Sequence, residues 1–252
     1  MNYVIIGNSV AAVGAVEGIR KQDKTTPIII ISDEPYHAYS RPLISYYLGR
    51  QVTQESIYYR TEDFYRVNRV ELILGIKAQQ VDFDRKEVIL QDGRRINYTK
   101  LLIATGGKPL IPPLEGIDKQ NVFNFSKFDD VKNIEKVATE GSKAIVVGAS
   151  FSGLKAVEAL VQRGVKVTVI DIMYRIMPRV FDEAASQMAL KTLEKYGVEI
   201  LLKSTVQKIL GDKTACGILL QDGRELFCDF IILAMGIRCN TDLVKDTKIN
   251  IK

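Results

Sequence analysis

The strongest constraint on the fold is a strand–turn–helix–strand pattern that occurs twice. The first copy starts Tyr3-Val-Ile-Ile-Gly7-Asn-Ser9-Val-Ala-Ala12, where an apolar strand leads into a turn of small residues and a helix that reaches about Gln22. The second copy, Ala144-Ile-Val-Val-Gly148-Ala-Ser150-Phe-Ser-Gly153, lies 141 positions later, counted from Gly7 to Gly148. A continuous apolar strand follows the first helix at 27–32, and a second strand follows the other helix at 165–170. This βαβ order predicts parallel strands buried on both faces of a sheet.

A second repeat follows each of these patterns. The letters Leu90-Gln-Asp-Gly-Arg94 recur as Leu220-Gln-Asp-Gly-Arg224, and in the same register residues 101–106 match residues 231–236. The segments at 80–90 and 206–220 are β-rich and predict a small antiparallel hairpin or meander before each Asp-Gly turn. Agreement over two separate stretches favours duplication over chance. We therefore predict similar α/β units at about 1–110 and 141–240, with a proline-rich linker and a short helix within 111–140.

Composition narrows the classes of function. A charged fraction of 26% and an apolar fraction of 46% are ordinary for a globular chain, and a net charge of +5 spread along 252 residues does not indicate a nucleic-acid partner. The apolar runs are of strand length, far below the ~18 residues that span a bilayer. No basic segment precedes the first strand, so no signal peptide is expected. Three cysteines without a Cys-x-x-Cys spacing indicate reduced thiols and a cytoplasmic protein.

The scarcity of histidine argues against histidine-based metal sites and catalytic triads. The single histidine, His37, leaves almost nothing for histidine metal clusters or Ser–His–Asp triads. We expect it to be an exposed loop residue, and we assign no catalytic and no metal-binding side chain. The reactivity is therefore expected to come from a bound cofactor.

The two turns resemble the dinucleotide fingerprint G-x-G-x-x-G. In that motif, glycines let a pyrophosphate approach the amides at a helix N-terminus. Serine replaces the second glycine in both copies, and its hydroxyl is small enough to donate to a phosphate oxygen. The fold class expected is thus α/β with two Rossmann-like domains, each a parallel sheet with helices plus a small antiparallel meander. The turn residues expected to contact cofactor are Gly7, Ser9, Val10, Ala11, Ala12, Gly148, Ser150, Phe151, Ser152 and Gly153.

An acidic residue follows the second strand of each unit. A carboxylate there accepts both hydroxyls of an adenosine ribose and repels a 2′-phosphate. Asp171 therefore favours NADH over NADPH, although Arg175 would offset this preference if it turned inward. In the first unit the candidates are Asp33 and Glu34, and a solvated loop charge is the alternative for one of them.

A tyrosine-rich stretch follows at 36–47. Arg41 suits a bidentate clamp on a pyrophosphate, and Pro42 offers a rigid surface beside a ring system. The alternative is an aromatic loop packed on its own domain, and Tyr46 and Tyr47 fit that interpretation.

Taken together, these motifs resemble the pyridine nucleotide–disulfide oxidoreductase superfamily, in particular its FAD-dependent NAD(P)H reductases: rubredoxin and ferredoxin reductases and the NADH/FAD part of assimilatory nitrite reductase. The first turn matches the family's FAD turn and the second its NAD(P)H turn. Segments 39–45, 104–109, 175–179 and 234–240 match further family motifs. The resemblance adds Ala78, Ala104, Thr105, Gly106 and Gly236 to the expected cofactor contacts. It implies hydride transfer from NADH to flavin N5, then electron transfer to an iron protein, a nitrite reductase module or a small acceptor. It leaves a homodimer open, and it gives no membrane partner.

The departures from the family are equally specific. No cysteine precedes Cys216, which argues against the branches that cycle an early cysteine, and Lys155 stands where many relatives have glutamate. Relatives continue into a strand and a Gly-Asp motif that completes the FAD site, whereas residues 241–252, including an expected strand at 248–252, only begin that return. The expected function is therefore an FAD-dependent NADH:acceptor oxidoreductase or its N-terminal fragment. The alternatives are a nucleotide-binding or regulatory fragment without turnover, and an NADH oxidase or disulfide reductase of the same fold.

Overall fold

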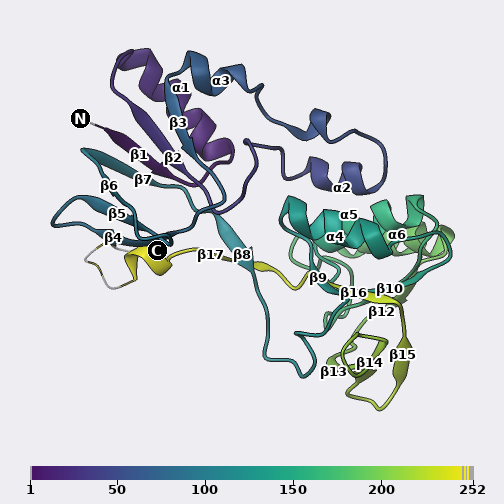
Figure 1. Cartoon of the computed structure of the whole chain (residues 1–252). Coiled ribbons are helices and arrows are strands. Elements are labelled where there is room, and N and C mark those ends of the chain that lie inside the picture. The colour runs from purple at the N-terminus through teal and green to yellow at the C-terminus, as the bar shows by residue number, and fades with distance from the viewer. Residues whose placement is uncertain (1, 246, 248, 250–252) are drawn as a thin grey trace. The chain divides into compact units, whose positions relative to one another are not determined.

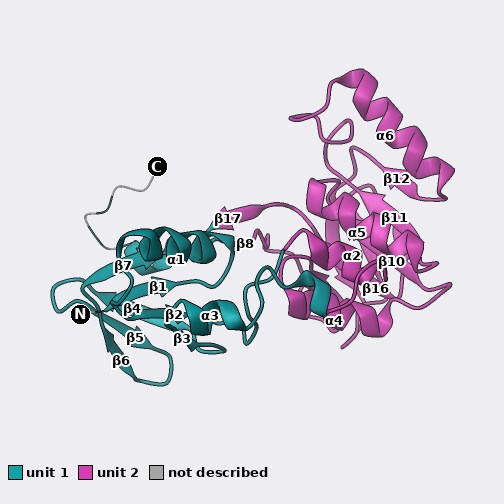
Figure 2. Cartoon of the chain, turned by 90° about the horizontal axis from the view of Figure 1, so that it is seen from above, with its two compact units in different colours: residues 1–40, 55–108, 239–252 teal, residues 41–54, 109–238 magenta. Residues whose placement is uncertain are grey.

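A computed structural model describes residues 2–245, 247 and 249 of the chain. The described residues within 1–40, 55–108 and 239–252 form one compact unit, and residues 41–54 and 109–238 form the other (Figure 2). The strand expected at 248–252 lies outside the described residues apart from Ile249. Each unit contains a parallel sheet and a three-stranded antiparallel meander, so the predicted fold class is confirmed.

The first unit is built on a four-stranded parallel sheet of order β3-β2-β1-β7 (Figure 1). Its strands are β1 (Tyr3–Ile6), β2 (Ile28–Ile31), β3 (Val70–Ile73) and β7 (Lys100–Ile103). Helix α1 (Val10–Gln22) connects β1 to β2, as the sequence pattern predicted, and α3 (Asp63–Val67) precedes β3. The meander joins β4 (Ala78–Asp82), β5 (Glu87–Leu90) and β6 (Arg95–Asn97).

Both faces of this sheet are covered, which explains why β2 is apolar at every position. Ile5, Ile28 and Ile30 pack in a cluster with Val13 and Val16 of α1. The alternate residues of the same strands, such as Ile29 and Ile31, pack in a second cluster with the meander. Successive side chains of a strand point to opposite faces, so a sheet with a helix on one side and a meander on the other needs apolar residues throughout.

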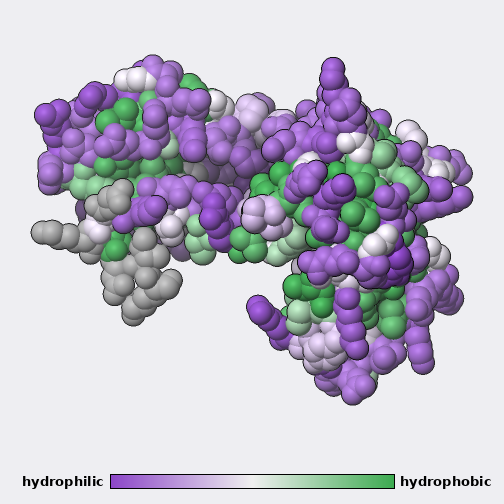
Figure 3. Space-filling model, turned by 90° about the horizontal axis from the view of Figure 1, so that it is seen from below, coloured by the Kyte–Doolittle hydropathy of each residue, from purple (hydrophilic) through white to green (hydrophobic). Residues whose placement is uncertain are grey.

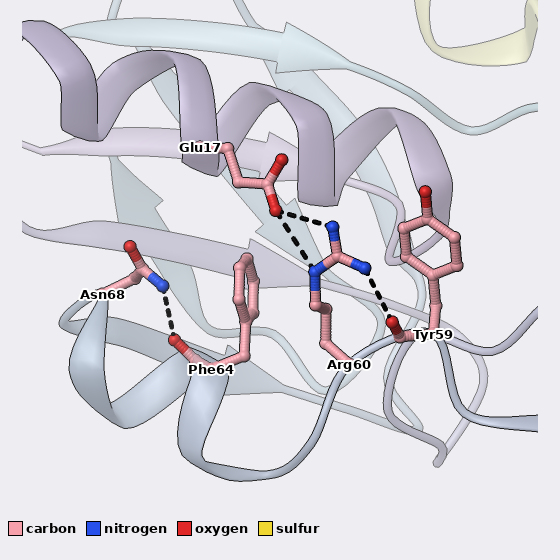
Figure 4. A network of polar contacts seen from close by, with 5 residues as sticks. All are labelled: Glu17, Tyr59, Arg60, Phe64 and Asn68. Carbon is pink, nitrogen blue, oxygen red and sulfur yellow. Dashed lines mark hydrogen bonds and ion pairs between the residues drawn. The ribbon is translucent and has the colours of Figure 1, made fainter. Parts of the chain in front are cut away.

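Arg60 ties α1 to the segment that leads into α3 (Figure 4). Its Nη2 and Nε donate to Glu17 Oε1 over 2.8 and 3.2 Å, and its Nη1 donates to the backbone oxygen of Tyr59 over 2.8 Å. Asn68 closes the end of α3 by donating from its side chain to the Phe64 carbonyl oxygen over 2.8 Å. These bonds hold the helices on the face of the sheet opposite the meander.

The second unit repeats this plan with one more strand, in the order β12-β11-β10-β16-β9. Its strands are β9 (Val122–Asn124), β10 (Lys143–Val147), β11 (Lys166–Ile170), β12 (Glu199–Leu201) and β16 (Phe230–Leu233). Helices α4 (Phe128–Val137), α5 (Phe151–Gln162) and α6 (Glu183–Lys195) connect them. Strand β9 lies in the segment where the sequence indicated only a linker and a short helix, because three residues show no clear period of their own.

The two meanders match in detail. In the second unit β13 (Val206–Leu210), β14 (Gly217–Leu220) and β15 (Glu225–Phe227) form the meander, with an irregular register after Val206 that has its counterpart after Ala78. In both Asp-Gly turns the aspartate accepts from the arginine amide two residues on over 3.1 Å, at Asp92 and at Asp222. The five repeated letters therefore encode the same turn twice, and the expectation of repeated meanders is confirmed.

The remaining elements lie outside the parallel sheets and the meanders. They are α2 (Leu43–Leu48), two 3₁₀ turns (Glu55–Ile57 and Asp242–Val244), β8 (Gly107–Pro109) and β17 (Ile237–Cys239), the last two paired in a two-stranded sheet. Helix α2 packs on α4 and α5, as part of the second unit. No helix among the described residues is both long and apolar enough to cross a bilayer.

Candidate functional site: two matching strand-to-helix turns

The first glycine of each turn has the same backbone geometry. Gly7 has φ +112° and donates to Ile31 O over 2.8 Å, and Gly148 has φ +108° and donates to Ile170 O over 2.7 Å. A Cβ on Gly7 would lie 2.2 Å from Ala104 O, and one on Gly148 would lie 2.5 Å from Ala234 O. Each turn is thus pressed against the end of the neighbouring strand, and only glycine fits this conformation and this spacing.

The third position of the motif differs between the units. A Cβ on Gly153 would lie 2.1 Å from the carbonyl oxygen of Gly148, so the helix packs directly on the turn. Ala12 holds the matching place in the first unit, where its methyl group is fully buried. The residue type at this position therefore follows from helix-to-turn packing in each unit.

The helix N-termini supply the donors that a pyrophosphate requires. Helix α1 begins at Val10 and α5 at Phe151, each directly after the carboxyl end of a central strand. The first amides of a helix have no intrahelical acceptor, and they carry the positive end of the helix dipole. The side chains of Val10 and Phe151 are exposed, so both helix N-termini lie at the surface of their units.

The two serines of the motif have different partners. Ser150 Oγ accepts from Gly153 N over 3.2 Å and donates to Ala234 O over 2.8 Å. Its proton is therefore used in the bond to Ala234 O, and the phosphate contact expected from the sequence stays a prediction. Ser9 makes no side-chain cap bond within the described part of the chain.

Asp171 lies against the second turn. Its Oδ2 accepts from Ala149 N over 2.6 Å, and its Oδ1 accepts from Met173 N over 2.8 Å. Each carboxylate oxygen can accept more than one hydrogen bond, so capacity for ribose hydroxyls remains. Arg175 donates from Nη2 to Pro178 O over 3.2 Å, and its Nε is buried without a hydrogen-bond partner.

The acidic candidates of the first unit separate by burial. Ile31 and Ile170 both accept from the first glycine of their turns, so the counterpart of Asp171 in chain order is Ser32. Asp33 is exposed, whereas Glu34 is buried and accepts from the Tyr39 hydroxyl over 2.6 Å. The structure thus makes Asp33 the accessible carboxylate.

The strand ends beyond β7 and β16 carry the remaining predicted contacts. Thr105 Oγ1 donates to Asn240 O over 3.0 Å, and Asn240 Nδ2 donates back to Thr105 O over 2.8 Å. Together with Ala104 and Gly106 they line a hollow of about 600 Å³ whose other walls are largely apolar. Asn240 was noted in the sequence only as part of a motif, and its bonds to Thr105 depend on the fold.

The other candidates lie as follows. Gly236 has φ +113° with open space where a Cβ would stand, so it leaves room beside β16. Ala78 begins β4 and is buried in the core between sheet and meander. Arg41 Nη1 donates to Ser126 O over 2.9 Å, and Pro42 precedes α2. The cofactor contacts of these residues stay predictions.

The tyrosine-rich stretch has partners of its own. Tyr47 donates to Glu135 Oε2 over 3.0 Å and packs on Phe128, and the Lys155 ammonium lies 4.3 Å from the Tyr46 ring centre. Both tyrosines thus pack within their unit. His37 is half-buried rather than exposed, because its ring packs 5.2 Å from that of Tyr65.

The surface around the second turn is partly apolar. Phe151, Ile172 and Ile237 each follow the end of a parallel strand, and each is more than half exposed. Figure 3 shows apolar residues, in green, reaching the surface of this unit among hydrophilic ones. Apolar contacts beside a few directed polar groups are typical of sites for flat aromatic ligands such as adenine. Among the described residues, no cluster of histidine, cysteine or acidic side chains suits a metal ion.

Comparison with known proteins decides the family. The model of the pyridine nucleotide-disulphide oxidoreductase family matches residues 1–252. The chain belongs to this family. The resemblance inferred from the motifs is thereby confirmed, and the enzyme class of this family is oxidoreductase.

Several members of the family are similar along nearly the whole chain. The assimilatory nitrate reductase electron transfer subunit of Bacillus subtilis is 31% identical over 98% of this chain, and 32% of that protein is covered. The NADH-dependent phenylglyoxylate dehydrogenase subunit epsilon of Aromatoleum evansii is 30% identical over 95% of this chain, covering 57% of that subunit. A putidaredoxin reductase, solved in covalent complex with putidaredoxin, matches all of this chain with a TM-score of 0.94 and 26% identity, covering 62% of the solved chain. The chain thus spans between about a third and three fifths of these relatives.

Proposed function

We propose that the chain is the FAD- and NADH-binding part of an NADH:acceptor oxidoreductase. The observation that carries the proposal is the pair of matching turns at Gly7 and Gly148, each at the carboxyl end of a parallel sheet and each leading into a helix N-terminus at the surface. Two such turns in one chain suit two dinucleotides. Family membership supports FAD for the first unit and NADH for the second.

In the first unit, the amides that follow Ser9 would hold the FAD pyrophosphate, and Asp33 would accept from its adenosine ribose. Thr105 and Gly106 line the hollow at the end of β7, where Asn240 fixes the threonine side chain. Arg41 and Pro42 remain proposed FAD contacts on the strength of the motif that contains them. Glu34 is the weaker ribose candidate, because its carboxylate is buried on Tyr39.

In the second unit, the amides that follow Ser150, up to that of Gly153, would hold the NADH pyrophosphate, and Asp171 would accept from the ribose. A carboxylate at this place disfavours the 2′-phosphate of NADPH, so NADH is the proposed coenzyme. Gly236 would leave room beside the coenzyme. When both cofactors are bound, NADH supplies a hydride to the flavin, which passes electrons on to an acceptor; the chain contributes binding and orientation.

The acceptor is proposed to be an iron protein, a nitrite reductase module or a small molecule. The names of the relatives support this range: one is an electron transfer subunit, and one was solved with putidaredoxin. A cytoplasmic location is proposed with it, supported by three free cysteines. The absence of any cysteine before Cys216 argues against an acceptor reduced through an early cysteine.

A visible spectrum tests the proposal. A purified protein that is yellow, and that bleaches when NADH is added without oxygen, supports the reductase, and a faster bleaching by NADPH would contradict the argument from Asp171. A colourless protein that takes up no added FAD would refute the proposal for this chain. In that case the alternative, a nucleotide-binding part without turnover, is favoured, because the chain spans only 32% of one relative.

A further inference from the structure

The Ser150 hydroxyl is fully engaged within its own unit. It accepts from Gly153 N over 3.2 Å and donates to Ala234 O over 2.8 Å, and the Ser152 hydroxyl lies 3.1 Å away. A serine hydroxyl carries one proton, so it donates to a phosphate only after the bond to Ala234 breaks. The same hydroxyl occupies the amide of Gly153, one of the donors that an anion at this helix would use.

The corresponding serine of the first unit differs. Both helices begin with the same backbone bond, from Val13 N to Ser9 O over 3.1 Å and from Leu154 N to Ser150 O over 2.8 Å. Within the described residues, however, Ser9 makes no side-chain cap bond. The first glycines of the two turns have matching φ angles, but the cap serines differ: Ser9 has φ −133° and Ser150 has φ −79°. With this difference, the Ser150 side chain closes its helix N-terminus, and the described residues show no such bond for Ser9.

We propose that Ser150 is a positioning residue that closes the second turn when no nucleotide is bound and thereby lowers its affinity for the pyrophosphate of NADH. This rests on the proposed function, which places NADH at that turn. An anion reaching the amide of Gly153 must displace the hydroxyl, and a serine cap contributes about as much as a fivefold change in an equilibrium constant.

The difference between the turns suits the two cofactors. A coenzyme that delivers a hydride must leave in every cycle, so a turn that closes on itself speeds its release. A flavin stays bound, and a turn without a competing cap holds its pyrophosphate more tightly. On this proposal, the Ser150 hydroxyl makes NADH at the second turn easier to exchange than FAD at the first turn.

Titration calorimetry with ADP-ribose tests this proposal, because ADP-ribose has the ribose and the pyrophosphate but transfers no electrons. We expect Ser150→Ala to bind ADP-ribose about fivefold more tightly than the parent, and Ser150→Thr, which keeps the hydroxyl, to restore the parent affinity. The KM for NADH should fall by a similar factor in Ser150→Ala without a rise in kcat.

Asp182→Ala is the matched control. Asp182 caps α6 of the same unit by accepting from Ala185 N over 2.8 Å, so its loss also lowers the melting temperature of the unliganded protein. It should leave ADP-ribose affinity unchanged. Weaker or unchanged binding of ADP-ribose in Ser150→Ala would overturn the proposal, since the hydroxyl would then raise the affinity for the pyrophosphate or have no effect on it. A parent protein that binds no ADP-ribose would refute the assignment of this turn to NADH, which is a separate result.

Discussion

Asp171 Oδ2 accepts a hydrogen bond from the backbone amide of Ala149 over 2.6 Å, so the acidic end of β11 is joined to the turn that follows β10. Backbone bonds from Gly148 to Ile170 and from Ala234 to Val147 complete the same corner of the sheet. The position of the carboxylate is therefore fixed by bonds among the ends of three strands.

Replacing Asp171 with alanine should relax the choice of coenzyme. Loss of the carboxylate removes both the acceptor for ribose hydroxyls and the repulsion of a 2′-phosphate, so we expect the ratio of kcat/KM for NADH over NADPH to fall about tenfold or more. Steady-state kinetics with both coenzymes measures it. Asp229→Ala is the control, because Asp229 also accepts from a backbone amide, that of Lys143 over 2.7 Å, away from the turn. An unchanged ratio in Asp171→Ala would exclude Asp171 from coenzyme selection.

Two glycines of the helices should respond in opposite directions to alanine. In Gly153→Ala the new Cβ meets the Gly148 carbonyl oxygen at 2.1 Å, and we expect a loss of about 1–3 kcal/mol in the free energy of unfolding. Gly14 lies inside α1 with nothing within 4 Å of an added Cβ, so Gly14→Ala should gain about 0.5–1 kcal/mol. Urea unfolding followed by circular dichroism checks both. Equal losses in the two variants would contradict the packing argument.

Arg163 should be the most costly arginine to replace in the second unit. Its side chain is 4% exposed and lies 3.6 Å from Glu135, and it donates to Ala138 O over 2.9 Å and to Leu48 O over 3.2 Å. Burial lowers the pKa of this guanidinium, but arginine keeps its charge at neutral pH. Arg163→Met leaves these acceptors without a donor, and we expect a loss of about 2–4 kcal/mol.

Limited proteolysis distinguishes this loss from a uniform one. The Leu48 bond holds α2 on the second unit, so cleavage within 41–54 should become faster in Arg163→Met than in the parent. Arg94→Met is the control, since the Arg94 side chain is 48% exposed and pairs with the neighbouring Asp92; it should change stability by less than about 0.5 kcal/mol. Equal effects of the two variants would refute the role of Arg163.

The three thiols should differ in reactivity. Cys216 and Cys239 are exposed, whereas burial raises the pKa of Cys228 to about 12. At pH 8 a disulfide-exchange reagent should therefore modify two thiols rapidly and the third only on unfolding. Because unfolded Cys228 loses its proton near pH 9 while the folded form keeps it, its contribution to stability decreases as pH rises from about 9 toward 12. Three equally fast thiols would contradict the burial of Cys228.

The repeated sequence pattern was enough to predict much of the fold. The turns at Gly7 and Gly148 and the strands β2 and β11 lie where the pattern predicted, because a tight turn and a buried parallel strand each require particular residue types. The repeated Asp-Gly turns could also be predicted from the sequence, since their hydrogen bonds join residues two positions apart. Strand β9 could not be predicted from the sequence, because its pairing with β16 joins residues far apart in the chain.

The candidate site, like the fold, has features that the sequence predicts and features that depend on the tertiary structure. The sequence by itself determined that two small-residue turns follow two apolar strands and that an acidic residue follows each second strand. Only the tertiary structure decided how the candidates differ. Glu34 is buried and bonded to Tyr39, while Asp33 is exposed. The Ser150 side chain caps its helix, and within the described residues the Ser9 side chain makes no such bond. Local patterns determine backbone conformation, but burial and side-chain partners depend on residues brought together from distant strands, such as Ala234 at the end of β16.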